Sequence, residues 1–81
     1  MNWPVNFPKS GMGIEEGTVT RWLRAVGDTV RKGEPLVEIE TAKSLQEVAA
    51  PTSGTLVRIL VHEGETAMVN TDLAVIEEDH G

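Results

Sequence analysis

The residue of this chain best placed to do chemistry is Lys43, which lies in the segment EIETAKSLQEV over residues 38–48. A lysine amine is a nucleophile that an activated acyl group can convert into a stable amide, and the amide no longer carries the charge. Lysines are also common on solvated turns, so position alone does not distinguish an acceptor amine from a surface charge. The structure that positions Lys43 must decide between the two.

The remaining polar residues indicate no further chemistry. His62 and His80 have no metal-ligand spacing with each other or with a carboxylate cluster, so we expect no metal site. No carboxylate pair can be assigned acid and base roles, and no serine stands in a nucleophile motif. The 81 residues contain no cysteine, which excludes disulfides, a thiol nucleophile and Cys-based zinc sites. These residues therefore indicate no catalytic site.

Composition limits the chain to one small domain whose partners are not nucleic acids. At 81 residues it can form a single domain, with a core over about 3–78 and a tail over 79–81. The net charge of −6 opposes the phosphate neutralisation that binding to DNA or RNA requires. No apolar run approaches the roughly 18 residues of a membrane span. We expect a monomeric domain in the bacterial cytoplasm, with the mitochondrial matrix as the alternative.

An internal repeat organises the chain. Shifting the sequence by 37 residues aligns residues 17–40 with residues 54–77 without a gap, and nine of the 24 aligned pairs are identical. A β unit of this size cannot bury its apolar face alone, so the two copies should close on each other about a pseudo-two-fold axis. The sequence therefore predicts an all-β fold, a flattened barrel or sandwich of two similar β units. We expect Trp3, Phe7 and Trp22 to be the large side chains that fill its core.

The predicted elements place Lys43 at the tip of a hairpin. Apolar patterns and turn residues predict strands near 4–7, 18–25, 36–41, 44–49, 55–62 and 73–77, with short pieces at 29–31 and 66–69. The segment TAKSL reverses the chain between two of these strands, and loops held by a rigid scaffold carry function disproportionately often. The pseudo-two-fold axis predicts both chain termini at the opposite pole, far from Lys43.

Two irregularities recur in both copies of the repeat. Apolar residues lie three apart where a regular strand would space them by two or four, which predicts one bulge in each copy. The pairs concerned are Val19 with Trp22 and Leu56 with Ile59. Gly33 and Asn70 are equivalent in the repeat and belong to the residue types that best tolerate a positive φ. We therefore expect a left-handed turn position at each.

Three segments together resemble the lipoyl domains of 2-oxo acid dehydrogenase complexes. They are FPKSGMGIEEGTVTRWL, GDTVRKGEPLVEIETAKS and EVAAPTSGTLVRILVHEGE, and the resemblance extends from Phe7 to about Glu77. The most specific element is IETAKS, which is similar to that family's modification motif, with Glu40 as the acid three residues before the lysine. The resemblance implies a single lipoyl-type domain over residues 1–81 with lipoic acid attached to Lys43.

The same resemblance implies roles for residues around the lysine. Glu40, Ala42 and Ser44 would form the turn that a lipoate ligase or lipoyl transferase recognises. Partner recognition would fall to a loop near that turn, over residues 9–17. The candidates in this loop are Ser10, Met12, Ile14 and Glu15. This chain departs from the family by having Ala42 where an acid is common and Asn70 where a glycine is common.

The function that the resemblance implies is that of an acyl carrier. Such a domain is not an enzyme and has no active site of its own, and it would be part of, or associated with, a dihydrolipoamide acyltransferase. A thiamine-diphosphate decarboxylase would load the lipoyl arm, an acyltransferase would pass the acyl group to coenzyme A, and a dihydrolipoamide dehydrogenase would reoxidise the arm. The glycine-cleavage version would carry an aminomethyl group. Two alternatives stay open, a biotin carboxyl carrier domain and an unmodified lipoyl-like interaction module. Biotin relatives usually flank their lysine with methionines, whereas Ala42 and Ser44 flank Lys43.

Overall fold

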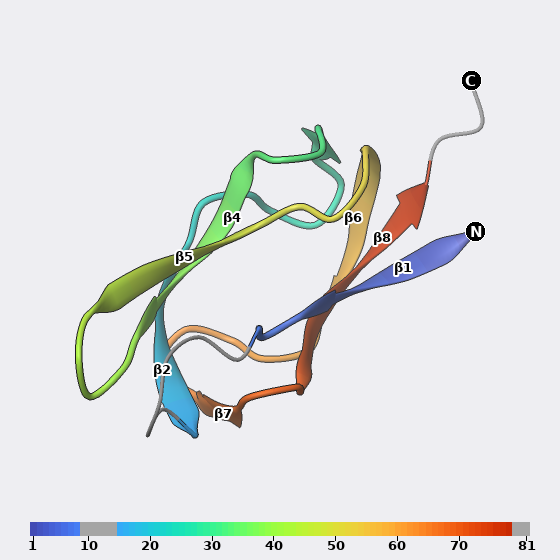
Figure 1. Ribbon diagram of the computed structural model, residues 1–81. Helices are drawn as coiled ribbons and strands as arrows, with labels where there is room; N and C mark the ends of the chain where they lie inside the picture. The colour runs from blue at the N-terminus through green and yellow to red at the C-terminus, as the bar shows by residue number, and fades with distance from the viewer. Residues whose placement is uncertain (9–14, 79–81) are drawn as a thin grey trace.

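The regular elements of the chain are all β-strands. The computed structural model describes residues 1–8 and 15–78, so the expected tail at 79–81 lies outside the described residues. The strands are β1 (Asn2–Asn6), β2 (Glu16–Trp22), β3 (Thr29–Val30), β4 (Pro35–Glu40), β5 (Leu45–Ala49), β6 (Gly54–Ile59), β7 (Thr66–Met68) and β8 (Asp72–Glu78) (Figure 1). No helix among the described residues could cross a membrane. The predicted all-β class is confirmed.

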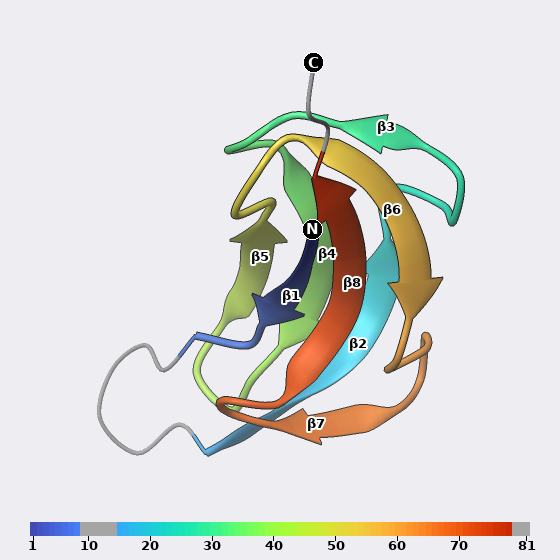
Figure 2. The same ribbon diagram turned by 90° about the vertical axis from the view of Figure 1, so that its right-hand side faces the viewer.

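Two four-stranded antiparallel sheets form the domain. One has the strand order β1-β8-β6-β3 and the other the order β5-β4-β2-β7, and the strands curve around a shared interior (Figures 1 and 2). Val19 and Ile39 from one sheet and Leu56 and Ile76 from the other are fully buried in one core cluster. The predicted flattened sandwich of two β units is confirmed.

The backbone repeats at the predicted shift of 37 residues. Strands β2, β3 and β4 correspond to β6, β7 and β8, and the backbone hydrogen bonds of one unit recur in the other. The recurring bonds include Gly27 N–H to Leu56 O (2.7 Å) with Gly64 N–H to Val19 O (2.7 Å), and Leu23 N–H to Leu36 O (2.7 Å) with Leu60 N–H to Leu73 O (2.8 Å). The first two bonds join the units to each other, so the turn of each unit is hydrogen-bonded to a strand of the other.

Both predicted irregularities are present. The pairing register shifts between Val19 and Arg21 in β2 and between Leu56 and Arg58 in β6, which places one bulge in each copy. Gly33 and Asn70 have φ angles of 92° and 69°, so both adopt the left-handed conformation. The asparagine takes the same backbone shape as its glycine counterpart, and the turn is conserved between the two units.

Two strands end earlier than the apolar pattern predicted. The strands predicted over 18–25 and 55–62 stop at Trp22 and Ile59. The reason is a carboxylate that closes the following turn by accepting a backbone hydrogen bond. These bonds run from Ala25 N–H to Asp28 Oδ2 (2.8 Å) and from His62 N–H to Glu65 Oε1 (2.7 Å). Apolar residues beyond the strand ends therefore belong to turns.

Only one of the three aromatic side chains expected in the core is fully buried. Phe7 has no solvent exposure, whereas Trp3 is 39% exposed and Trp22 packs against the core from its edge. The indole N–H of Trp22 donates to Val61 O at 2.9 Å. Because a buried indole N–H needs a partner, Trp22 sits where it can reach a main-chain oxygen. The core consists mainly of aliphatic side chains.

We predict that Gly54→Ala destabilises the domain more than Gly17→Ala, although the two glycines are equivalent in the repeat. A Cβ at Gly54 would overlap the main-chain oxygen of Glu77, whereas one at Gly17 would overlap the Cγ2 methyl group of the Ile39 side chain. A side chain can shift and a central strand cannot. We expect a loss of about 3 kcal/mol or more for Gly54→Ala and about 1–2 kcal/mol for Gly17→Ala. Urea unfolding of both variants measures this, and equal losses would contradict it.

Candidate functional site

A two-residue loop between β4 and β5 carries Lys43 at its tip. Thr41 N–H donates to Ser44 O at 2.9 Å, and only Ala42 and Lys43 lie beyond this bond. Ala42, Lys43 and Ser44 are all exposed. The predicted display of Lys43 on a hairpin tip is confirmed.

The lysine hairpin lies at the pole opposite the start of β1 and the end of β8. Figure 1 shows the loop between β4 and β5 at the end of the molecule far from the start of β1 and the end of β8. The repeat carries Thr41 onto Glu78, whose N–H donates to Met1 O at 2.8 Å. Equivalent main-chain hydrogen bonds therefore close the turn that carries Lys43 at one pole and join the two ends of the described chain at the other. The predicted separation is confirmed for the two ends of the described chain, Met1 and Glu78, and residues 79–81 lie outside the described residues.

Thr41 organises the loop, and the sequence reasoning did not identify it. Its side chain is buried, although its neighbours Glu40 and Ala42 are exposed. The hydroxyl donates to Ser44 O at 3.0 Å and accepts hydrogen bonds from Lys43 N–H at 3.3 Å and Ser44 N–H at 3.2 Å. A threonine that begins a short turn is a recognisable signal, because Ser and Thr hydroxyls bond backbone groups two or three residues on.

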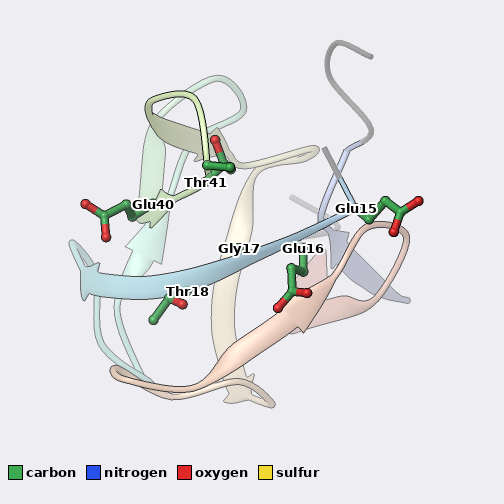
Figure 3. A pocket seen from close by; sticks show the side chains of 7 residues that line it. Glu15, Glu16, Gly17, Thr18, Glu40 and Thr41 are labelled. Atoms are coloured by element: carbon green, nitrogen blue, oxygen red, sulfur yellow. The ribbon is translucent and has the colours of Figure 1, made fainter. Parts of the chain in front are cut away.

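A polar hollow lies beside the loop. Its volume is about 450 Å³, and its lining residues are Glu15, Glu16, Gly17, Thr18, Glu40, Thr41 and Ala42. Figure 3 shows the carboxylates of Glu15, Glu16 and Glu40 at separate points around it. In keeping with this separation, the described part of the chain has no group of three or more His, Asp or Glu side chains that could hold a metal ion. The surroundings of the lysine turn are acidic and open to solvent.

Glu40 stands in the strand that leads to the turn. It is exposed, as predicted, and lies in the sheet between Thr18 of β2 and Leu45 of β5. Leu45 is an apolar side chain that is 57% exposed beside the turn, and the sequence reasoning did not select it. Exposed apolar groups of this kind can serve contact with another protein.

The structure describes only part of the predicted recognition loop. Ser10, Met12 and Ile14 lie outside the described residues. Glu15 is exposed, lines the hollow beside the turn, and accepts a hydrogen bond from Val69 N–H at its main-chain oxygen at 2.9 Å. The end of the predicted loop is therefore close to the turn that carries Lys43.

Comparison with known proteins places the chain in a family. A family model described as "Biotin-requiring enzyme" matches residues 4–76. The chain is 46% identical over 72 residues to the dihydrolipoyllysine-residue acetyltransferase component of the pyruvate dehydrogenase complex of Corynebacterium glutamicum, covering 89% of this chain and 11% of that protein. It is 43% identical over 77 residues to the succinyltransferase component of the 2-oxoglutarate dehydrogenase complex of Staphylococcus saprophyticus, covering 95% and 18%. The chain thus spans less than a fifth of either relative.

Solved structures agree with the sequence relatives. The lipoyl domain of the 2-oxoglutarate dehydrogenase complex of Azotobacter vinelandii superposes with a TM-score of 0.70 at 30% identity, covering 91% of this chain and 96% of that domain. A region of the Kluyveromyces lactis urea carboxylase gives a TM-score of 0.81 at 26% identity, covering 95% of this chain and 6% of that protein. The chain therefore belongs to the biotin/lipoyl attachment family, and within it to the lipoyl domains of 2-oxo acid dehydrogenase complexes.

Proposed function

We propose that Lys43 carries lipoic acid in amide linkage and that the domain moves acyl groups between the active sites of a 2-oxo acid dehydrogenase complex. The observation that carries this proposal is the exposed Lys43 at the tip of a two-residue loop, at the pole opposite Met1 and Glu78. A group attached there projects from a rigid scaffold. The chain itself supplies position, and not an active site.

The residues around Lys43 fit a lipoyl group. The lysine is exposed, so a modifying enzyme can reach it, and its amide product would be a long neutral arm. When bound, the group supplies a dithiolane that accepts an acyl group and two electrons, a chemistry that this cysteine-free chain cannot supply. Glu40, Ala42 and Ser44, all exposed, form the surface beside the lysine that a lipoate ligase or lipoyl transferase would contact.

The partners follow from the carrier role. They would be a thiamine-diphosphate decarboxylase that loads the arm, an acyltransferase that unloads it, and a dihydrolipoamide dehydrogenase that reoxidises it. A tethered arm makes each encounter nearly intramolecular, so tight binding to any one of these enzymes is not required. The relatives named above include an acetyltransferase and a succinyltransferase component, and the proposal covers the carrier step common to both. The expected compartment remains the bacterial cytoplasm, with the mitochondrial matrix as the alternative.

The second candidate is a biotin carrier, and the superposition on a urea carboxylase region favours it. Identity argues the other way, since the chain is 46% identical to an acyltransferase component and 26% identical to the carboxylase region. Met68 lies on β7 and Met1 at the opposite pole, so neither takes the place of the methionines that flank a biotinylated lysine. The intact mass of the protein from its native cell distinguishes one lipoyl group, one biotinyl group and no modification, the last favouring an interaction module.

We predict that Lys43→Arg abolishes lipoylation without unfolding the domain. Arginine keeps the positive charge at the exposed tip but offers no acceptor amine, and a surface substitution should change stability by no more than about 0.5 kcal/mol. Incubation with a lipoate ligase, ATP and lipoic acid, followed by intact mass, measures the gain. Lys32→Arg and Lys9→Arg are the controls and should still gain one lipoyl group. A lipoyl group on Lys43→Arg would assign the site elsewhere.

We predict that Glu40→Gln slows lipoylation several-fold and leaves thermal unfolding nearly unchanged. The side chain is exposed beside the turn, so its charge can contribute to encounter with the ligase and adds little to the core. Glu77→Gln is a matched control, because Glu77 is the repeat counterpart of Glu40 and is also exposed. A large loss of stability with a normal lipoylation rate would show that Glu40 is a structural residue instead.

A further inference from the structure

Thr41 uses the full hydrogen-bonding capacity of a buried hydroxyl on the lysine loop. A threonine hydroxyl offers one donor and two acceptor positions. All three are engaged by the two residues that follow Ala42, through Ser44 O, Lys43 N–H and Ser44 N–H at 3.0, 3.3 and 3.2 Å. Thr41 is only 9% exposed, so water cannot readily replace these bonds if the hydroxyl is removed.

The other pole of the domain shows that the β scaffold does not need this hydroxyl. Glu78 is the repeat counterpart of Thr41. Its N–H donates to Met1 O, as the N–H of Thr41 donates to Ser44 O. Its side chain has no turn to hold and instead accepts a hydrogen bond from Thr52 Oγ1 at 2.7 Å. The equivalent main-chain hydrogen bond thus forms with a glutamate in place of the threonine. The Thr41 hydroxyl is therefore needed for the loop and not for the pairing of the strands.

We propose that Thr41 is the positioning residue of the lysine loop, holding the backbone of Lys43 and Ser44 in one conformation from which the modified side chain projects. The inference rests on the proposed lipoylation of Lys43. A modifying enzyme must bring the lysine Nζ to a narrow range of positions, and a loop that samples many conformations presents the competent one for only a fraction of the time. Loss of the hydroxyl would lower kcat/KM for lipoylation in proportion to the drop in the population of the competent conformation.

Thr52 provides a matched control. It is 8% exposed, and Thr41 and Thr52 are the buried polar residues of the described chain. Thr52→Val removes one buried hydroxyl at the opposite pole, where it bonds Glu78. It should destabilise the domain without reaching Lys43. A general effect of losing a buried hydroxyl is thereby separated from an effect on the loop.

The experiment compares Thr41→Val, Thr41→Ser and Thr52→Val in two measurements. Amide hydrogen exchange of Lys43 and Ser44 in the unmodified domain should accelerate at least about tenfold in Thr41→Val, and kcat/KM for lipoylation should fall about tenfold. Thr41→Ser keeps the hydroxyl and should stay within about twofold of the parent in both. Thr52→Val should leave both unchanged. Unchanged exchange in Thr41→Val, or equal effects of Thr41→Val and Thr52→Val, would overturn the proposal.

Two further comparisons keep the test decisive. If Thr41→Val does not fold, Thr41→Cys against Thr41→Ser replaces it, since the two side chains are of similar size and a thiol is a weak hydrogen-bonding group. Faster exchange in the cysteine variant alone supports the proposal, and equal exchange overturns it. The exchange measurement needs no lipoyl group, so it assigns Thr41 even if Lys43 proves to be unmodified, which the mass measurement on Lys43→Arg reports separately.

Discussion

The fold depends on mutual burial, because neither β unit can cover its own apolar face. Val19 and Ile39 from one unit share a dry core with Leu56 and Ile76 from the other, and the two units exchange main-chain hydrogen bonds through Gly27 and Gly64. Two similar units that close on each other have two equivalent poles. A single chain can link the strands of only one pole by a short turn. The place of the lysine follows from this constraint, since the loop over Ala42 and Lys43 is that link.

A rigid scaffold with one mobile arm suits a carrier. The exposed loop lies at one pole, and the ends of the described chain pair through Met1 and Glu78 at the other. Any tether attached at the second pole leaves the first pole free to enter successive active sites. A tethered arm has a high effective concentration near its partner enzymes, so tight binding to them is not required. The surface around Lys43 can therefore remain polar and open, as the acidic hollow beside it is.

Much of the fold was predictable because the repeat supplied two copies of each signal. The bulges in β2 and β6 and the left-handed positions at Gly33 and Asn70 were each indicated by equivalent residues in both copies. The ends of β2 and β6 were not predicted, because apolar residues continue past them. The strands end where a carboxylate accepts a backbone hydrogen bond and closes the following turn. Trp22 was assigned to the interior by size, but its indole N–H holds it at the edge of the core.

In the candidate site, too, one residue was predicted from a sequence pattern and another was recognised only in the structure. Lys43 could be found from the motif and the hairpin because both are local in sequence. Thr41 was missed: its place before a short turn is a signal in the sequence, but its role becomes clear only when the hydroxyl is seen to bond Lys43 and Ser44.

The hydroxyl of Thr41 is important because residue 42 is an alanine and has no polar side chain. The resemblance to lipoyl domains leads us to expect an acid before the lysine, whereas this chain has Ala42, whose methyl group can form no hydrogen bond. Of the two residues at the tip, only Lys43 has a polar side chain, and it is the side chain that we propose to be modified. Ala42 contributes only its backbone to hydrogen bonds in the loop. In this chain the Thr41 hydroxyl bonds Ser44 O, Lys43 N–H and Ser44 N–H, so hydrogen bonds from the residue before the tip hold the backbone of the loop.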